Sequence, residues 1–457
     1  MILRKKIAIS LLVFQFSIFN FQFSIECFAQ ENENNPNHPF SLQQAVDYAM
    51  QNQTKVLDAA IDEKIAKAKM HEITGMGFPQ IGANIDVKDF TQLPTSLLPG
   101  DFFGMPGTYV PVKFGLPYNG SAGIDFSQLI FSASYIVGLQ ASKTYIELSK
   151  KASTRTKIET VAAVTKAYYG VLVNEERIKL LNVNIDKIKT LLNASKVMNE
   201  NGYVEKIDVD RLSLAYNNLI TEKEKIESFI KLSNALLKYQ MGMDQSNELT
   251  LSDKLEDITF NVDTNSSQKM DYNSRIEYSL MQSQLKLSML DLKRYRLSSL
   301  PSLVMYGSFS QNAQRAEFNF LDASEHWYPT SLIGFKLSIP IFDGSQTCFR
   351  TQQAKLAVQK NKNDLIFVQQ SIDMELQSSK TTLFSNISTL DMQKKNIALA
   401  EEVYRVTKIK YEQGVGSNIE VLNAETSLKE SQVNYFSALY DALISKVDYE
   451  KAKGQIK

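Results

Sequence analysis

Four segments of the chain alternate between apolar and polar residues, which is the period of a β-strand with one apolar face. The first shows the pattern most clearly, because Ile81, Ile85 and Val87 alternate with Asp86 and Lys88. Each segment is about nine to eleven residues long, the length of a strand that crosses a bilayer at a tilt of about 45°. The predicted strands lie at about 80–89, 122–131, 302–311 and 331–341.

Helical periodicity fills most of the remaining chain. No proline occurs from Tyr118 to Leu300 or from Ile341 to Lys457, so long helices meet no breaker there. We predict shorter helices at about 42–51, 54–75 and 272–299. We also predict two long helical hairpins at about 134–241 and 346–453, each reversed at a glycine-containing turn.

Heptad spacing marks the contact faces of these hairpins. Leu212, Leu219 and Ile226 are seven residues apart, which predicts a coiled-coil seam. In the last helix, a row of small residues at the same spacing should let a neighbouring helix approach closely; the row comprises Ala424, Ser431, Ala438 and Ser445.

The same order of elements occurs twice along the chain. Segment 201–209 returns as 413–421, and the same shift carries Gly242, which ends one helical pattern, onto Gly454, which ends the other. Self-similarity at a fixed shift indicates one structural unit that was built twice. We therefore predict a first repeat over 30–246, a connector over 247–269 and a second repeat over 270–457.

Residues 1–29 are typical of a secretory signal peptide. A basic start that includes Arg4 and Lys5 precedes an apolar run, and Ala29 is a suitable cleavage residue. The alternatives are a transmembrane anchor, or a lipid anchor on Cys27. Cleavage after Ala29 leaves Cys348 as the only cysteine, so the mature chain can form no intramolecular disulfide.

Composition argues against several classes of function. The chain has 50 basic and 50 acidic residues, so it lacks the basic excess that is typical of nucleic-acid-binding proteins. The Gly414–Ser417 segment lacks the lysine of a phosphate loop. Asp208 and Asp210 diverge on a helix and have no evident third metal ligand. We predict no enzyme activity, no metal site and no cofactor.

A single chain with four such strands cannot close a barrel. Open strand edges in lipid leave backbone groups unsatisfied, at a cost of several kcal/mol each. Two chains would give eight strands around a filled interior, whereas three would give twelve around a passage. The segments 90–118 and 311–330 would be outer loops, and Trp327 with its neighbours fits an interfacial aromatic girdle. Soluble sheets and plain coiled coils show similar patterns and remain the alternative.

Two segments carry a resemblance to the TolC-like outer-membrane efflux proteins. The segment Leu337–Gly344 resembles the family's last strand and the glycine-bearing junction that follows it. The segment Tyr411–Ala424 resembles the periplasmic turn and final helix. The resemblance extends over nearly the whole mature chain.

This resemblance implies an α+β membrane protein. In a homotrimer, four strands per chain would contribute to a shared outer-membrane β-barrel of twelve strands, and the helical hairpins would form an α-barrel that extends into the periplasm. The implied function is passive efflux of small toxic compounds. The implied partners are outer-membrane lipid, a periplasmic membrane-fusion adaptor and an inner-membrane pump.

The resemblance also assigns residues at the two hairpin turns. Adaptor docking falls on Gly202 and Gly414, with Tyr203 and Val415 beside them.

A pore constriction is implied on the helices next to the same turns. By motif position it comprises Asp208, Tyr411, Glu420 and Asn423. Two positions depart from the family pattern: Gly416 stands in place of a locking arginine, and Asn423 in place of a second acid. The locking ion pair is therefore not carried over to this chain.

The acidic residues at the turns have two possible roles. Three copies of Glu420 around a narrow bore would favour cations. Alternatively, Asp208 and Glu420 only complement the dipoles of the helices that they begin. The function likewise has two alternatives to drug efflux: an outer-membrane duct for type I protein secretion, or a periplasmic coiled-coil scaffold that is not a channel.

Overall fold

The computed structural model describes residues 39–255 and 271–456. The predicted signal peptide, including Cys27, lies outside the described residues, as does the predicted connector beyond residue 255. Residues Phe40–Lys457 form one compact unit.

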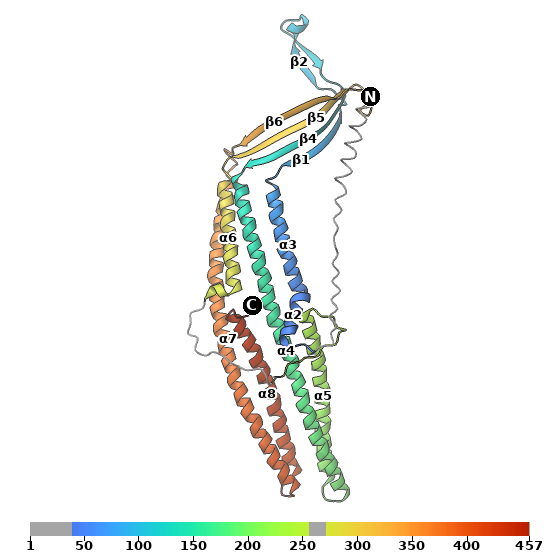
Figure 1. The fold of residues 1–457 in the computed structure, drawn as a ribbon, viewed down its shortest axis with the longest axis vertical. Helices are drawn as coiled ribbons and strands as arrows, with labels where there is room; N and C mark the ends of the chain where they lie inside the picture. The colour runs from blue at the N-terminus through green and yellow to red at the C-terminus, as the bar shows by residue number, and fades with distance from the viewer. Residues whose placement is uncertain (1–38, 256–270, 457) are drawn as a thin grey trace. The chain divides into compact units, whose positions relative to one another are not determined.

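Long helices, a four-stranded antiparallel sheet and a two-stranded β-hairpin make up this unit (Figure 1). In chain order, with η for a 3-10 helix, the elements are α2 (Leu42–Asn52), α3 (Thr54–Gly75), β1 (Gln80–Asp89), β2 (Thr95–Pro99), η1 (Gly100–Phe103), β3 (Tyr109–Lys113), β4 (Tyr118–Phe131), α4 (Ala133–Glu200), α5 (Lys206–Met241), η3 (Tyr272–Ser274), α6 (Ile276–Leu297), β5 (Ser302–Arg315), β6 (Tyr328–Ser338), α7 (Gln346–Glu412) and α8 (Asn418–Ala452).

The main sheet has the strand order β1-β4-β5-β6, and every neighbouring pair is antiparallel. Two strands are longer than the alternation predicted, since β4 begins at Tyr118 and β5 ends at Arg315, which pairs with Tyr118. The last strand ends at Ser338 rather than Ile341, because Pro340 has no N–H with which to continue the ladder.

Register gives the sheet one apolar face and one polar face. Ile81 pairs with Phe126, and the same row ends at Ile333 on β6. A row on the other face includes Asn84 and Ser310. The apolar face remains open, with Ile81 72% and Ile333 77% exposed. An apolar face of this kind needs either another protein surface or lipid to cover it.

The segment 90–118, which we predicted to be a loop, contains a second sheet. Strands β2 and β3 pair as an antiparallel hairpin, with Leu97 opposite Pro111 and Pro99 opposite Tyr109. Prolines normally argue against a strand, and here they lie in a two-stranded ribbon whose outer edges need no donor.

The predicted helix 272–299 is likewise two elements. Asp271 accepts from the Asn273 backbone N–H at 3.0 Å and starts η3, and the chain is extended at Arg275 before α6 begins. Arg275 is only 3% exposed. Its guanidinium binds Glu277 at 3.0 Å, Glu375 at 2.6 Å and the Ala452 carbonyl at 2.7 Å. A buried cation with three acceptors holds this break in place.

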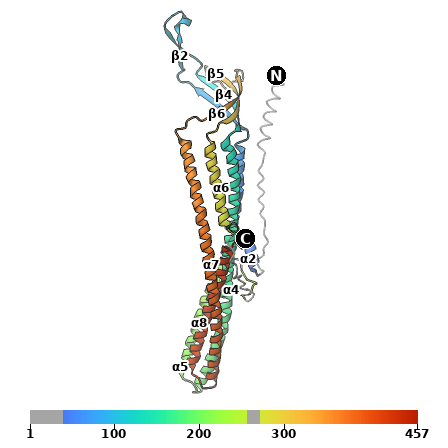
Figure 2. The same cartoon turned by 90° about the vertical axis from the view of Figure 1, so that its left-hand side faces the viewer.

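The helices stand in two rows that share α4. In the row next to the sheet, α3 contacts α4, α4 contacts α6, and α6 contacts α7. In the row farther from the sheet, α5 contacts α4, α4 contacts α8, and α8 contacts α7 (Figures 1 and 2). The α4 helix has 68 residues, or about 100 Å at 1.5 Å per residue. Helix α7, with 67 residues, also belongs to both rows. None of the described helices is long and apolar enough to span a membrane.

The repeat is visible where each hairpin ends. Gly242 and Gly454 both have positive φ, 72° and 70°. A Cβ at Gly242 would lie 2.5 Å from the Asn52 carbonyl oxygen, and a Cβ at Gly454 would lie 2.8 Å from that of Ser274. Each glycine therefore lets the end of a hairpin abut the helix break near the start of its own repeat.

The coiled-coil seam is confirmed. Leu212, Leu219 and Ile226 are all buried on the face of α5 that packs against α4. Burial of each such side chain contributes about 1.5–3 kcal/mol.

Candidate functional site at the hairpin tips

The two hairpins turn at the end of the molecule opposite the sheet (Figure 1). In the first turn, Gly202 has φ 79°, and the Tyr203 N–H donates to the Met198 carbonyl at 2.9 Å. In the second turn, Gly414 has φ 74°, and the Val415 N–H donates to the Lys410 carbonyl at 3.0 Å. Both are helix ends closed by a left-handed glycine, so the two predicted docking turns share one backbone conformation.

The side chains beside these glycines project outward. Tyr203 is 82% exposed and Val415 is 79% exposed. A Cβ built on Gly202 or Gly414 would meet no atom within 4 Å. Glycine is therefore needed at these positions for its backbone conformation and not for lack of space. Each turn therefore exposes a glycine and one large apolar side chain beside it.

Gly416 is different from the two turn glycines. A Cβ at this position would lie 3.0 Å from the Lys410 Cβ and 3.1 Å from the Tyr411 backbone nitrogen. The Gly416 N–H also donates to the Lys410 carbonyl at 3.1 Å. A larger residue here, such as the arginine of the family pattern, would require the turn to shift.

The four predicted constriction residues do not form one cluster. The Tyr411 hydroxyl lies 3.4 Å from Ser195 Oγ on α4. Asp208 is half-buried and pairs with Arg211 at 3.4 Å on its own helix. Glu420 and Asn423 are exposed. Within one chain, then, Tyr411 and Asp208 bond to different partners.

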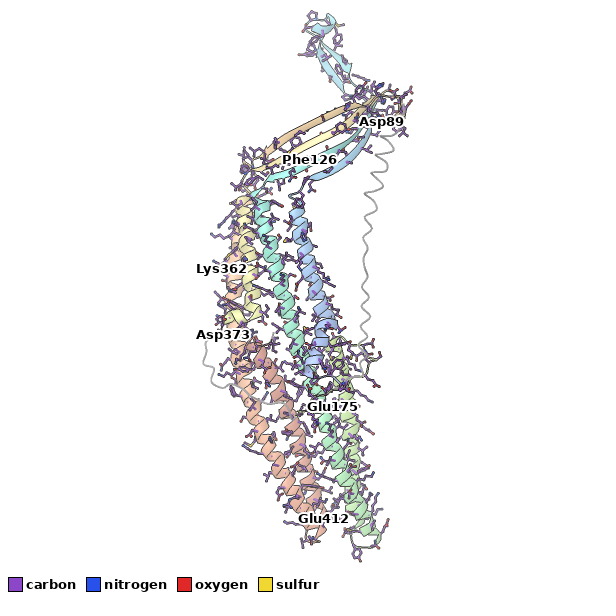
Figure 3. The ribbon with its side chains drawn as sticks, in the orientation of Figure 1. Asp89, Phe126, Glu175, Lys362, Asp373 and Glu412 are labelled. Atoms are coloured by element: carbon purple, nitrogen blue, oxygen red, sulfur yellow. The ribbon has the colours of Figure 1, made fainter. Side chains whose placement is uncertain are left out.

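Glu420 lies in the first turn of α8. Its backbone N–H donates to the Ser417 hydroxyl at 3.3 Å, which is an N-cap contact. Its carboxylate has a favourable place next to the helix dipole. Figure 3 shows the neighbouring Glu412 at the end of α7, on the other side of the same turn.

A polar row that the sequence analysis missed joins the two hairpins. Asn418, Glu425 and Gln432 are seven residues apart on α8, and all are more than nine-tenths buried. Asn418 Nδ2 donates to the Asp208 carbonyl at 3.0 Å, and Gln432 Oε1 accepts from Asn184 at 2.6 Å. Their heptad spacing is the signal in the sequence that could have identified them.

Glu425 is the central member of this row and the least satisfied. Its Oε1 atom has no hydrogen-bond partner among the described residues. Burial raises the pKa of the Glu425 carboxyl above its usual range, and only Lys429 on the same helix opposes this effect. Across from it on α7, burial and the nearby Glu425 raise the pKa of the Tyr404 hydroxyl. Lys187 of α4 lies 6.0 Å from the centre of the Tyr404 ring.

Apolar contacts surround the polar row. Leu192, Leu212, Tyr404, Val421 and Leu428 belong to one buried cluster that draws on α4, α5, α7 and α8. The joint between the hairpins therefore combines a small apolar cluster with polar contacts, one of which leaves an acid without a partner. Such a joint is less stable than a fully apolar seam of the same size.

This arrangement offers binding surfaces and a joint between hairpins but no evident catalytic group. Within residues 39–255 and 271–456, no cluster of three or more His, Cys, Asp or Glu residues could hold a metal ion.

Similarity to known proteins covers both sequence and fold. Residues 277–455 match the family described as "Outer membrane efflux protein". Outer membrane protein TolC of Vibrio cholerae is 21% identical over 341 residues, which are 74% of this chain and 77% of that protein. The toluene efflux pump outer membrane protein TtgC of Pseudomonas putida is 20% identical over 343 residues, or 74% of this chain and 69% of that protein.

A solved structure has the same fold. The open state of the Neisseria gonorrhoeae MtrE outer membrane channel matches with a TM-score of 0.72 at 16% identity, and the match covers 90% of this chain and 88% of that one. The likeness therefore extends over nearly all the described helices and strands.

Proposed function

We propose that this chain, which is a TolC-like outer-membrane efflux protein, forms a homotrimeric channel that passively conducts small toxic compounds to the exterior. The observation that carries the proposal is a pair of unsatisfied edges, one on each side of the chain.

The first edge consists of β1, α3 and α5. Strand β1 ends the sheet and follows α3, and α5 ends the row of helices at the tips. On α3, Leu57, Ile61 and Ile65 repeat every four residues and are 45–55% exposed, whereas Ala59 and Ala66 are buried. An exposed apolar stripe opposite a buried one indicates a second packing partner.

The second edge consists of β6 and α7. Strand β6 ends the sheet on the other side and leads into α7, which ends both rows of helices. Phe349, Leu356, Phe367 and Met374 on α7 are all more than half exposed. The edge of one copy can therefore pair with the opposite edge of another.

Different surfaces at the two edges make a head-to-tail interface, which generates a closed ring when the rotation between neighbouring copies closes. Four strands from each of three copies would give a barrel of about twelve strands with room for a passage. In that ring the apolar face of the sheet would contact lipid, and the polar face would line the passage.

The tips would be the periplasmic end of the channel. Gly202 with Tyr203 and Gly414 with Val415 would contact a periplasmic adaptor that links the channel to an inner-membrane pump. Asp208, Tyr411, Glu420 and Asn423 would surround the narrow end of the passage. Two features support docking at the turns: their shared backbone conformation and the exposure of Tyr203 and Val415.

Mass measurement of the purified protein in detergent tests the assembly. We expect about three times the mass of one mature chain, in a form that dissociates on heating. A stable single chain would contradict the proposal. Drug susceptibility of a deletion strain tests the cargo: increased susceptibility supports small-molecule efflux, and unchanged susceptibility would indicate the protein-secretion alternative.

A further inference from the structure

A hollow of about 590 Å³ lies in the row of helices next to the sheet, between the sheet and the breaks that precede α3 and α6. Residues of α3, α4, α6 and α7 all line it. Binding sites for small organic molecules are typically about 300–1,000 Å³. The hollow therefore has the size of a ligand site, and of its lining residues only Ile65 also belongs to the exposed apolar stripe of α3.

The hollow lies on the concave side of the row. Contacts join α3 to α4, α4 to α6 and α6 to α7, so α3 and α7 are its two ends. A hollow that reaches both ends of a row of four helices requires the row to curve around it, as the two views in Figures 1 and 2 indicate. In the proposed ring this concave side faces the passage.

Small residues keep the hollow open. Gly138 lies inside α4, where glycine is less favourable than alanine by about 1 kcal/mol. A Cβ at Gly138 would meet no atom within 4 Å, so no close contact requires glycine here. Ala141, Ala354 and Ala357 extend the same surface on α4 and α7.

The remaining lining combines an apolar body with a charged rim. Ile65, Tyr145 and Leu287 supply apolar surface from three helices. The charged residues are two cations, Lys69 and Arg294, and one acid, Asp291.

Each rim cation has one acidic neighbour and keeps further donors. Arg294 pairs with Asp291 at 2.7 Å, and its guanidinium has other N–H groups. Lys69 pairs with Glu72, and both of those side chains are more than half exposed. The rim can therefore accept one more negative group.

We propose that this hollow binds an amphipathic organic anion. The apolar part of the ligand would lie against Ile65, Tyr145 and Leu287, and its acidic group would lie at Lys69 and Arg294. Only the position on the passage rests on the proposed ring, since one chain supplies every lining residue.

Energy transfer from a tryptophan placed in the hollow tests the proposal. The chain has a single tryptophan, Trp327, in the loop between β5 and β6. In a Trp327→Phe, Tyr145→Trp protein, the only tryptophan lies in the hollow. The probe is 1-anilinonaphthalene-8-sulfonate, an aromatic anion, titrated into protein in lipid nanodiscs. We expect saturable energy transfer, whereas probe dissolved in lipid would give a linear background.

Two further variants in this background locate the site. Gly138→Leu should fill the hollow and raise the apparent Kd about tenfold or more. Gly75→Leu is the matched control, because Gly75 ends α3, lies outside the lining and also has open space around its Cβ. Equal affinity in the Gly138→Leu and Gly75→Leu proteins would overturn the proposal.

Charge is tested with Lys69→Gln, Arg294→Gln and a neutral probe of similar shape, N-phenyl-1-naphthylamine. We expect the double substitution to weaken binding of the anionic probe and to leave binding of the neutral probe unchanged. Equal effects on both probes would overturn the assignment to an anion. The mass of the same samples separates the two proposals: a trimer without saturable transfer contradicts the ligand site alone, and a monomer that binds contradicts the ring alone.

Discussion

Glu425 is a carboxyl group enclosed between two helical hairpins, with one oxygen unpartnered among the described residues. Because burial raises the pKa of this group, the Glu425 carboxyl stays protonated up to a higher pH in the folded protein than in the unfolded chain. The contribution of Glu425 to stability is therefore best below the pKa of an exposed glutamate, about 4.3, and falls as the pH rises through the pKa in the folded state.

Glu425→Gln should remove this loss, since glutamine keeps the shape and carries no charge. We expect hydrogen exchange in the first turns of α8 to be slower in the variant than in the wild type at pH 7.5, and nearly equal near pH 4. Glu430→Gln, at an exposed position on the same helix, is the control. A difference that does not change with pH would contradict the explanation.

Glu420 lies at the tip, where the two roles of an acid can be separated. If three copies surround the passage, Glu420→Gln should reduce cation selectivity in planar-bilayer recordings, and Asn423→Asp should increase it. If Glu420 only complements its helix dipole, the substitution should cost at most about 1 kcal/mol of stability and leave selectivity unchanged.

At this scale, the sequence could predict residues whose role is local. Gly202 and Gly414 need a positive φ because each ends a helix, and that requirement depends only on neighbouring residues. The burial of Glu425 depends on the second hairpin packing against the first, far away in the sequence. The family pattern pointed to Tyr411 and Asp208, but which partner each binds depends on side-chain packing that no motif encodes.

The secondary-structure elements show the same division between local and distant causes. The long helices follow from long proline-free stretches, and the four main strands follow from the alternation of apolar and polar residues. The β2–β3 hairpin was missed because Pro99 and Pro111 interrupt its pattern. The break before α6 was missed because Arg275 is held by Glu375 and the Ala452 carbonyl, which come from other parts of the chain.

The two turns, taken as elements, should be separable from the rest of the assembly. Gly202→Leu with Gly414→Leu adds a bulky side chain to each turn and strains each turn by about 1–2 kcal/mol. We expect the oligomer to remain in the membrane, because the buried seam of each hairpin is unchanged, and drug resistance to fall to that of a deletion strain.

Asparagine at the same two positions is the control, because it tolerates a positive φ. Resistance that survives the double leucine substitution would contradict docking at the turns.

At the scale of the whole molecule, the open edges determine what one chain can do alone. Four strands predicted the need for partner chains, but the sequence did not show which surfaces meet. That depends on α3, α5 and α7 lying at the ends of the helical rows, which is a property of the packed chain.

Ile61→Lys tests the first edge. Ile61 is 50% exposed on α3, so a lysine has room in the single chain. In the assembly it would place an unpaired charge in an apolar contact, at a cost of several kcal/mol in each interface. We expect less oligomer by mass measurement and unchanged helical content by circular dichroism. Lys64→Ile, an exposed lysine one turn further along α3, should not reduce the assembly.

The difference between the two edges has a genetic consequence. A chain with a defect on α3 still presents an intact α7, so it can join normal subunits on one side and leave the ring open on the other. In a cell that makes both kinds of chain at equal levels, most assemblies would contain a faulty member. Such an allele should be dominant over the wild type, whereas an allele that prevents folding should be recessive.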